Sequence, residues 1–269
     1  MNSGQGGRAP PPLPEAARRA WLEAMGIPCW VPRQTPPVPS LADRVEAADR
    51  DARPAHGTAG AASGTDAVEQ PVDEVGDGAR AAVARMDWEA LHTTVLGCRL
   101  CGLCAGRTQA VFGVGSREAD LLVIGEAPGQ EEDREGEPFV GPAGQLLDRM
   151  LSAIGLDRQS VYITNVLKCR PPRNRDPQAE EAQACAPYLR RQIELLEPRV
   201  ILAVGRISCQ QLLETDASIG RLRGRWHRYG PRDTPLRVTY HPAYLLRRPP
   251  EKAKAWADLC AVRAALDPA

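Results

Sequence analysis

From residue 83 onward, short apolar runs alternate with amphipathic helical patterns, and this alternation strongly limits the folds open to the chain. Four runs rich in β-branched residues are typical of buried parallel strands, and the segments between them have helical periodicity. The alternation predicts an α/β fold, a three-layer α/β/α sandwich with right-handed crossovers and a central four-stranded parallel sheet. The expected strands are 120–125, 161–166, 200–205 and 236–240, and the expected helices are 87–96, 143–154, 177–196, 207–213 and 250–266.

The first 82 residues have a different composition. They are dense in Pro, Ala, Gly, Asp and Ser and lack sustained apolar periodicity, so they cannot bury enough surface to offset the entropy lost on ordering. We therefore expect a largely disordered arm over 1–82 and a folded domain over 83–269. Within the arm, residues 15–25 place Trp21 and Leu22 on one helical face before Gly26, which predicts a short amphipathic helix.

This short helix has three candidate roles. It could dock on the chain's own core, have no role, or bind an unknown protein partner, and the first two interpretations are favoured. We expect the protein itself to be a monomer.

Targeting signals are missing from the sequence as given. Residues 1–14 have no basic segment followed by an apolar one, and no stretch of eighteen apolar residues occurs in the chain. We therefore expect a cytoplasmic protein with no membrane association. Its eight cysteines should be reduced rather than paired as disulfides.

Charge is balanced overall, which argues neither for nor against a nucleic-acid partner. The arm carries 8 basic and 11 acidic residues and the remainder carries 26 and 23, so only the folded part is slightly basic. Its cations are clustered, although such clusters alone support phosphate binding only weakly. The clusters are Lys168, Arg170, Arg173 and Arg175; Arg221, Arg223, Arg225 and Arg228; and Arg247 with Arg248.

Polar residues follow each of the four expected strands. In open parallel sheets, ligands bind beyond the carboxyl ends of the strands. Glu126, Asn165, Arg206 and His241 follow the four strands in turn. Each has an ordinary structural interpretation, as a loop carboxylate, a turn cap, a surface cation or a core histidine. Four strand ends in register instead predict a functional site at this edge of the sheet.

Four cysteines suggest a metal centre. Cys98 and Cys101 form a short chelating turn, whereas Cys169 and Cys185 are separated and lie after the second strand. This spacing suits either zinc or a four-thiolate iron–sulfur cubane, and Cys104 could add a third local ligand. The remaining cysteines are interpreted as an arm residue and as small buried apolar residues: Cys29, Cys209 and Cys260.

Three sequence blocks in a fixed order carry a family resemblance. GEAPGQEEDREGEPFVGPAGQLLDRML, VYITNVLKCRPP and HPAYLLR, behind an upstream CRLC, resemble the family 4 uracil-DNA glycosylases, the iron–sulfur branch of that superfamily. The resemblance covers about residues 88–266 and makes 83–269 the catalytic domain. It implies hydrolysis of the N-glycosidic bond of uracil in single- or double-stranded DNA, which leaves an abasic site and initiates base excision repair. It also implies a [4Fe-4S] cluster held by Cys98, Cys101, Cys169 and Cys185, with Cys104 not required.

The resemblance also implies roles in a pocket for a flipped-out uracil. Phe139 is expected to stack on the base, with Ala127 beside it, and His241 to hydrogen-bond uracil O2. Asn165 suits the reading of uracil because its amide can donate to O4 and accept from N3–H at once. The carboxylates of Glu126 and Glu132 are expected to act on water or on the sugar, with Glu126 lining the pocket and Glu132 nearer the water.

DNA contacts are expected beside this pocket. Leu245 and Leu246 are predicted to form an apolar wedge on an exposed loop, next to the cation Arg247. Leucines in such a position pack in the core about as often as they are exposed. The family resemblance favours the exposed wedge. The cluster is expected to be structural and to present Arg170 to DNA.

Three other functions were weighed against uracil excision. A non-catalytic iron–sulfur or zinc DNA-binding module would share the fold. A relative that traps its product covalently through a histidine-containing loop is disfavoured, because the stretch RPPRNRDPQ after Cys169 has no histidine. A hydrolase of free nucleosides would have no use for a wedge.

Overall fold

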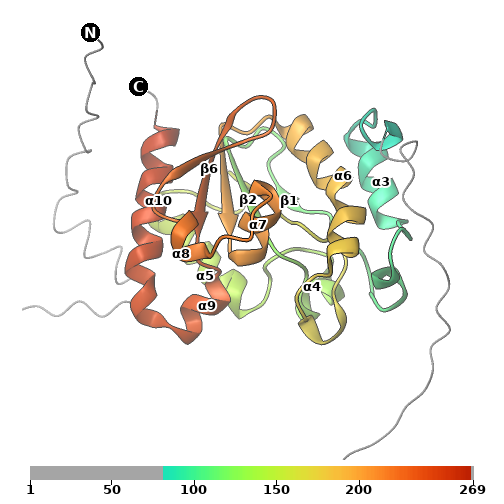
Figure 1. The fold of residues 1–269 in the computed structure, drawn as a ribbon, viewed down its shortest axis with the longest axis horizontal. Coiled ribbons are helices and arrows are strands. Elements are labelled where there is room, and N and C mark those ends of the chain that lie inside the picture. The colour runs from blue at the N-terminus through green and yellow to red at the C-terminus, as the bar shows by residue number, and fades with distance from the viewer. Residues whose placement is uncertain (1–80, 268–269) are drawn as a thin grey trace, which may run out of the picture. The chain divides into compact units, whose positions relative to one another are not determined.

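The computed structural model describes residues 81–267, and the predicted arm with its helix at 15–25 falls almost entirely outside them. The described chain has a six-stranded sheet with the order β1-β3-β2-β4-β6-β5, covered by helices (Figure 1). The four central strands are parallel, and the two edge strands are antiparallel to their neighbours. The strands are β1 (Val114–Gly115), β2 (Leu121–Gly125), β3 (Tyr162–Asn165), β4 (Val200–Val204), β5 (Trp226–Tyr229) and β6 (Thr234–Thr239).

The expected α/β fold is confirmed, whereas the expected count of four strands is corrected to six. The four predicted strands are the central ones, and every residue of β2, β3 and β4 is buried. The two additional edge strands, β1 and β5, lack the long apolar runs that predict a buried strand. β1 has only two residues, and β5 is polar and partly exposed, as edge strands commonly are.

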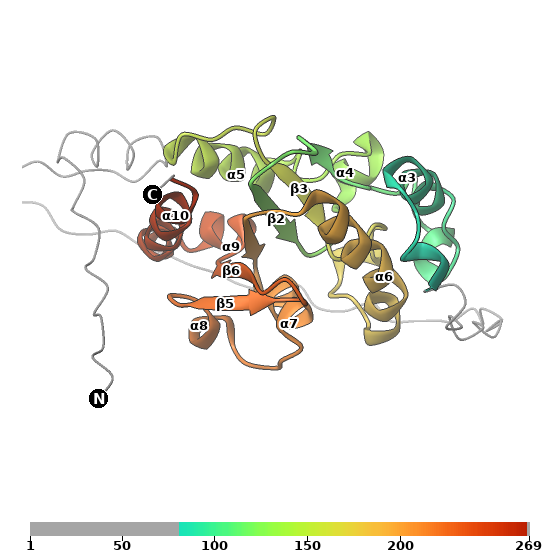
Figure 2. The same ribbon diagram turned by 90° about the horizontal axis from the view of Figure 1, so that it is seen from above.

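Helices cover both faces of the sheet, which gives the three layers. α5, α9 and α10 pack on one face against alternate strand residues such as Val123 and Leu202. α6 and α7 pack on the other, against Leu122 and Ile201 (Figure 2). The helices are α3 (Trp88–Leu96), α4 (Gln130–Glu135), α5 (Pro142–Ala153), α6 (Ala179–Leu196), α7 (Arg206–Leu213), α8 (Ile219–Leu222), α9 (Pro242–Arg247) and α10 (Lys252–Leu266), with 3₁₀ turns at Gly102–Ala105, Pro172–Asn174 and Pro249–Glu251.

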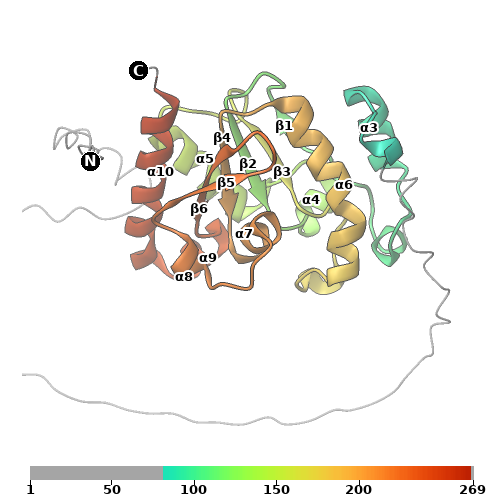
Figure 3. The ribbon, with the colours of Figure 1, turned by 45° about the horizontal axis from the view of Figure 1, so that its top comes forward.

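A third apolar cluster joins α3 to α6 at the end of the sheet that carries β1. Figure 3 shows α3 lying beside α6, and Leu91, Val95, Cys169 and Cys185 are buried between these segments. The predicted cysteine centre therefore lies within the folded domain. No helix of the described residues is long and apolar enough to cross a membrane.

A buried ionic cluster fastens α10 to β6. Asp258 of α10 is fully buried and accepts from Arg237 of β6 at 3.0 Å and from Arg223 at 2.7 Å. Arg223 also lies over the ring of Tyr240, 5.1 Å from its centroid. In sequence, Arg223 belongs to a cluster of cations that could bind phosphate. In the structure its guanidinium instead pairs with the buried Asp258.

We predict that Asp258→Ala destabilises the protein by about 3 to 5 kcal/mol, because it leaves two arginines without their buried counter-charge. The measurement is the urea midpoint of unfolding. Asp120→Ala is the matched control, since it removes an exposed ion pair to Arg199 whose loss should change stability by less than about 1 kcal/mol. Equal midpoints for the two variants would contradict the prediction.

Candidate functional site

A large cavity lies at the carboxyl ends of the parallel strands, where the sequence predicts the site. Its volume is about 1030 Å³, and its lining comes from the segments that follow β2, β3, β4 and β6. In Figure 1 this is the lower end of the sheet, near α4, α7 and α9. The structure brings together most of the predicted site residues here, namely Glu126, Ala127, Glu132, Phe139, Asn165, His241 and Arg247.

Gly125 allows the centre of the cavity to form. It ends β2 directly opposite Asn165 at the end of β3. A Cβ atom on Gly125 would lie 2.4 Å from Asn165 Oδ1 and 2.5 Å from Phe139 Cζ. Because these distances are far below van der Waals contact, only glycine lets the amide and the aromatic ring converge on this point.

Asn165 carries an unusual polar atom. The residue is only 2 % exposed, and its Oδ1 is buried with no hydrogen-bond partner among the described residues. A buried acceptor without a donor costs about 1 to 3 kcal/mol, and such atoms are rare in native proteins. The side chain is therefore suited to accept a hydrogen bond from a ligand that enters the cavity.

The backbone of Asn165 is held by Lys168, a residue that the sequence reading grouped with surface cations. Lys168 is 1 % exposed, and its Nζ donates to Asn165 O at 2.9 Å, to Thr164 Oγ1 at 2.6 Å and to Gln192 Oε1 at 2.6 Å. Burial lowers the pKa of Lys168 to about 7. Through these hydrogen bonds the amino group of Lys168 links the end of β3 to α6. Because it is buried, it is not available to bind DNA.

Phe139 and His241 form one wall of the cavity. Phe139 is 5 % exposed, and its ring lies nearly parallel to the imidazole, with 5.6 Å between centroids and 28° between planes. The backbone of Phe139 has a φ of 56°, in the left-handed region that non-glycine residues seldom adopt. The aromatic wall is therefore built on a strained turn.

The imidazole of His241 is held in one protonation state. His241 caps α9, and its Nδ1 accepts from the backbone N–H of Ala243 at 3.2 Å. Burial, together with the charge of Arg247, lowers the pKa of His241 to about 4. The ring is thus neutral at pH 7, and because Nδ1 accepts, Nε2 carries the proton and can donate it in a hydrogen bond.

The two predicted carboxylates lie in different environments. Glu132 accepts three backbone N–H bonds, from Gly129 at 3.0 Å, Val140 at 3.1 Å and Gly141 at 3.2 Å. Oε2 accepts from Gly129 at the N-terminus of α4, and Oε1 accepts from the two residues that follow Phe139. Glu132 therefore links the start of α4 to the turn that carries Phe139.

The carboxyl group of Glu126 is half-buried, and it accepts no backbone N–H bond from the described residues. Burial, and secondarily the negative charge of Asp176, raise the pKa of Glu126 to about 7, against the opposing effect of Arg206. Arg206, from the end of β4, pairs with Asp176 at 2.5 Å on the rim of the cavity. The charge of Glu126 therefore changes near neutral pH.

Two tyrosines that the sequence reading did not assign also line the cavity. Tyr240 and Tyr244 lie with their ring centroids 5.0 Å apart, on either side of His241 in sequence. The motif HPAYLLR contains Tyr244, so its position beside the histidine was visible in the sequence. Its contribution to the wall follows only from the turn of α9.

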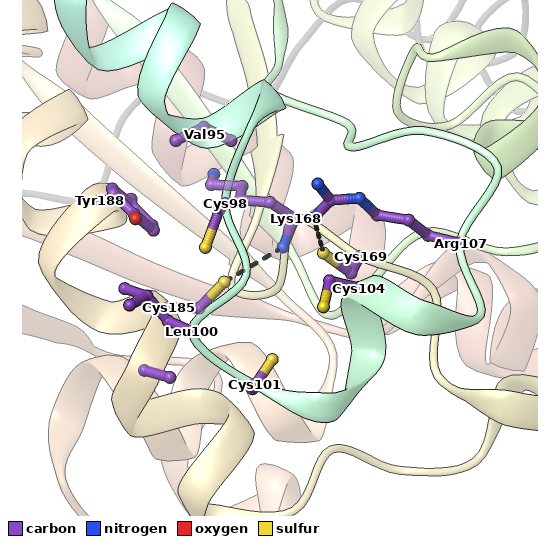
Figure 4. A pocket seen from close by; sticks show the side chains of 11 residues that line it. Val95, Cys98, Leu100, Cys101, Cys104, Arg107, Lys168, Cys169, Cys185 and Tyr188 are labelled. Atoms are coloured by element: carbon purple, nitrogen blue, oxygen red, sulfur yellow. Dashed lines mark hydrogen bonds between the residues drawn. The ribbon is translucent and has the colours of Figure 1, made fainter. Parts of the chain in front are cut away.

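The cysteines gather around a second, smaller cavity. The side chains of Cys98, Cys101, Cys169 and Cys185 all line it, from three segments: the turn after α3, the stretch after β3 and the interior of α6 (Figure 4). Cys104, which the resemblance does not require as a ligand, lines the same cavity. The sulfur atoms of all five edge one space in Figure 4.

Nitrogen donors point at two of these sulfurs. Arg107 Nη1 donates to Cys169 Sγ at 2.9 Å, and the backbone N–H of Lys168 donates to Cys185 Sγ at 3.4 Å. Such bonds stabilise thiolates that bind a metal. Burial alone has the opposite effect and raises the pKa of Cys185 to about 12 and of Cys101 to about 11. No simple sequence signal identifies Arg107 as a partner of this centre.

The donor set fits a thiolate-bound group. Within residues 81–267, no three His, Cys, Asp or Glu side chains have the arrangement of a single-ion site. In a cubane each thiolate binds a different iron atom, so the sulfurs lie farther apart than around one zinc ion. The four thiols that line this cavity could therefore hold a thiolate-bound metal centre.

Of the residues predicted to contact DNA, some are exposed and one is buried. Leu245 is only 1 % exposed and packs in the core, whereas Leu246 is 46 % exposed. Residues 242–247 form helix α9 rather than the expected exposed loop, and successive helical residues point in different directions. Arg247 is exposed on the cavity rim, and Arg170 is partly exposed and bonds Asn174 at 2.8 Å.

Comparison with known proteins agrees with this geometry. Residues 112–260 match the model of the uracil DNA glycosylase superfamily. The chain is 47 % identical to a type-4 uracil-DNA glycosylase of Archaeoglobus fulgidus over 162 residues, which are 58 % of this chain and 81 % of the relative. It is 46 % identical to one of Saccharolobus solfataricus (63 % and 82 % covered) and 44 % identical to one of Pyrobaculum aerophilum (65 % and 92 % covered). The chain therefore belongs to the uracil-DNA glycosylase superfamily and, within it, to the type-4 family.

Proposed function

We propose that this protein excises uracil from DNA by hydrolysing the N-glycosidic bond of a flipped-out nucleotide, with the base bound between Phe139, Asn165 and His241. Family membership supports the activity. The observation that supports uracil as the base is the buried Oδ1 of Asn165, which has no hydrogen-bond partner among the described residues. Uracil N3–H would supply the missing donor, while the amide N–H₂ would donate to O4. Cytosine offers a bare ring nitrogen and an amino group at these positions, so both interactions would fail.

His241 acts on the leaving group. As the bond between C1′ and N1 breaks, its electron pair moves to the base, and the negative charge reaches O2. A neutral imidazole that donates from Nε2 stabilises this charge more in the transition state than in the bound substrate. Because the pKa of His241 is held at about 4, donation requires no protonation of the ring at pH 7.

Glu126 acts on the sugar and on water. As a carboxylate it offsets the positive charge that develops on the sugar ring, and it orients the water whose oxygen adds to C1′. Glu132 is a positioning residue in this scheme, because its backbone bonds hold the turn that carries Phe139. This assignment replaces the sequence expectation that Glu132 lies nearer the water.

Replacing the uracil-reading amide tests the function. We expect Asn165→Ala to lower the single-turnover rate on a uracil-containing oligonucleotide at least 100-fold, because the base loses both edge contacts. Abasic sites are measured by alkaline cleavage. Gln145→Ala removes an exposed amide on α5 and should keep the wild-type rate. Full activity of Asn165→Ala, or no excision by the wild-type protein, would refute the proposal.

The titration of Glu126 predicts a pH profile. Since its pKa is raised to about 7 and the active form is the carboxylate, kcat/KM should rise with pH and reach half its maximum near pH 7. Glu126→Gln should be slow and should lose this acidic limb. The limb cannot come from His241, whose pKa is about 4. A limb that persists unchanged in Glu126→Gln would assign the titration to another group.

The thiol-lined cavity is proposed to hold a [4Fe-4S] cluster through Cys98, Cys101, Cys169 and Cys185. The cluster would cross-link the turn after α3, the segment after β3 and helix α6, and hydrolysis needs no electron from it. Its role is therefore structural. It would fix the segment of residues 169–185, which carries Arg170 and, in the lining of the large cavity, Arg175.

Two serine variants separate ligands from bystanders. We expect Cys169→Ser to lose the brown colour, most of the bound iron and stability, since one iron loses its thiolate. Cys104→Ser should keep all three, although Cys104 lines the same cavity. Iron content, visible absorbance and thermal midpoint are measured on anaerobically purified protein. Loss of iron from Cys104→Ser with retention in Cys169→Ser would overturn the ligand set.

Leu246 is the proposed wedge, beside Arg247 as a phosphate contact. An exposed apolar side chain on the rim can fill the gap left by the flipped nucleotide. The neighbouring guanidinium of Arg247 can bind a phosphate of the DNA backbone. A cytoplasmic location, a monomeric state and a protein partner for the arm remain predictions from the sequence.

A further inference from the structure

The backbone at Phe139 is strained, and something must hold it. Its φ of 56° is unfavourable for a residue with a side chain, and conformations of this kind persist only where the surroundings enforce them. The space is also tight, because a Cβ atom on Gly144 would lie 1.7 Å from the carbonyl oxygen of Phe139. The ring cannot keep its place beside His241 unless this turn is fixed.

Arg158 contacts the turn directly. From the loop between α5 and β3, its Nη1 donates to Phe139 O at 3.0 Å and its Nη2 donates to Pro138 O at 2.7 Å. Two successive carbonyls are therefore bound by one planar guanidinium. This fork has a fixed geometry, so it holds the orientation of the peptide between Pro138 and Phe139 as well as its position.

Arg158 is itself held in place. Its Nη1 also pairs with Asp148 of α5 at 3.1 Å, and its side chain is 24 % exposed. The loop that carries it is a compact turn, in which Asp157 Oδ1 accepts from the backbone N–H groups of Gln159 and Ser160 at 3.0 and 2.8 Å. The guanidinium thus transmits the position of a rigid loop to the aromatic wall without lining the cavity.

We infer that Arg158 is a positioning residue for uracil recognition, which acts through the backbone of Phe139 and sets the plane on which the base stacks. This inference rests on the proposed function of Phe139. Glu132 holds the residues that follow Phe139, and Arg158 holds Phe139 and the residue before it. The aromatic ring is therefore fixed from both sides of its own peptide.

A double-mutant cycle tests the inference. We expect Arg158→Met to lower the single-turnover rate on uracil-containing DNA on the order of 10- to 100-fold, the effect of misplacing a group that positions the substrate. Inhibition by free uracil should weaken, while the Kd for DNA without uracil should stay within about 2-fold. Because Arg158 acts through Phe139, the variant Arg158→Met/Phe139→Ala should be no slower than Phe139→Ala alone.

Arg191→Met is the matched control. Arg191 also donates to a backbone carbonyl, that of Met86 at 2.8 Å, and pairs with a carboxylate on its own helix, with 21 % of its side chain exposed. It belongs to α6, contacts the segment before α3 and does not line the cavity, so its loss should leave the rate and uracil inhibition unchanged. If Arg158→Met proves unstable, Arg158→Lys replaces it in the same cycle and should give a smaller defect with the same dependence on Phe139.

The outcomes separate the inference from the function. Multiplied rate losses in the double variant, or an Arg158→Met rate equal to that of Arg191→Met, would overturn the positioning role while uracil excision stands. A wild-type protein that releases no uracil would overturn the proposed function and this inference with it. A rate loss that disappears in the Phe139→Ala background supports the inference.

Discussion

The site depends on the close approach of two strand ends, where Gly125 faces Asn165 across β2 and β3. A glycine at the end of β2 leaves space that an amide and an aromatic ring fill from opposite sides. The parallel register then delivers the other groups to the same edge, because β4 and β6 end beside them with Arg206 and His241. The chemistry of the pocket therefore follows from sheet geometry, and the loops supply the finer placement.

The strands and the groups at their ends could be predicted because both are local properties of the sequence. Buried parallel strands leave continuous apolar runs, and the residue after each run is fixed at the edge of the sheet. Leu245 shows where this reasoning fails, since a six-residue helix turns one leucine into the core and its neighbour to the surface. A stretch of apolar sequence this short does not show which side chain is buried.

Long-range polar contacts were equally hidden from the sequence. Lys168 sits among other cations in sequence, yet its ammonium is buried because Thr164, Asn165 and Gln192 converge on it. Arg158 and Arg107 act on a carbonyl and a sulfur that are 19 and 62 residues away. Such contacts depend on the tertiary fold, so they cannot be predicted from the periodicity of the sequence or from the spacing of its residues.

The unpaired oxygen of Asn165 has a thermodynamic consequence for the whole domain. Together with the left-handed backbone of Phe139, it lowers the free energy of unfolding of the protein. A base that supplies the missing donor relieves part of this loss, so ligand binding and global stability are thermodynamically linked. If Asn165 reads the base as proposed, binding of uracil would raise the free energy of unfolding of the protein.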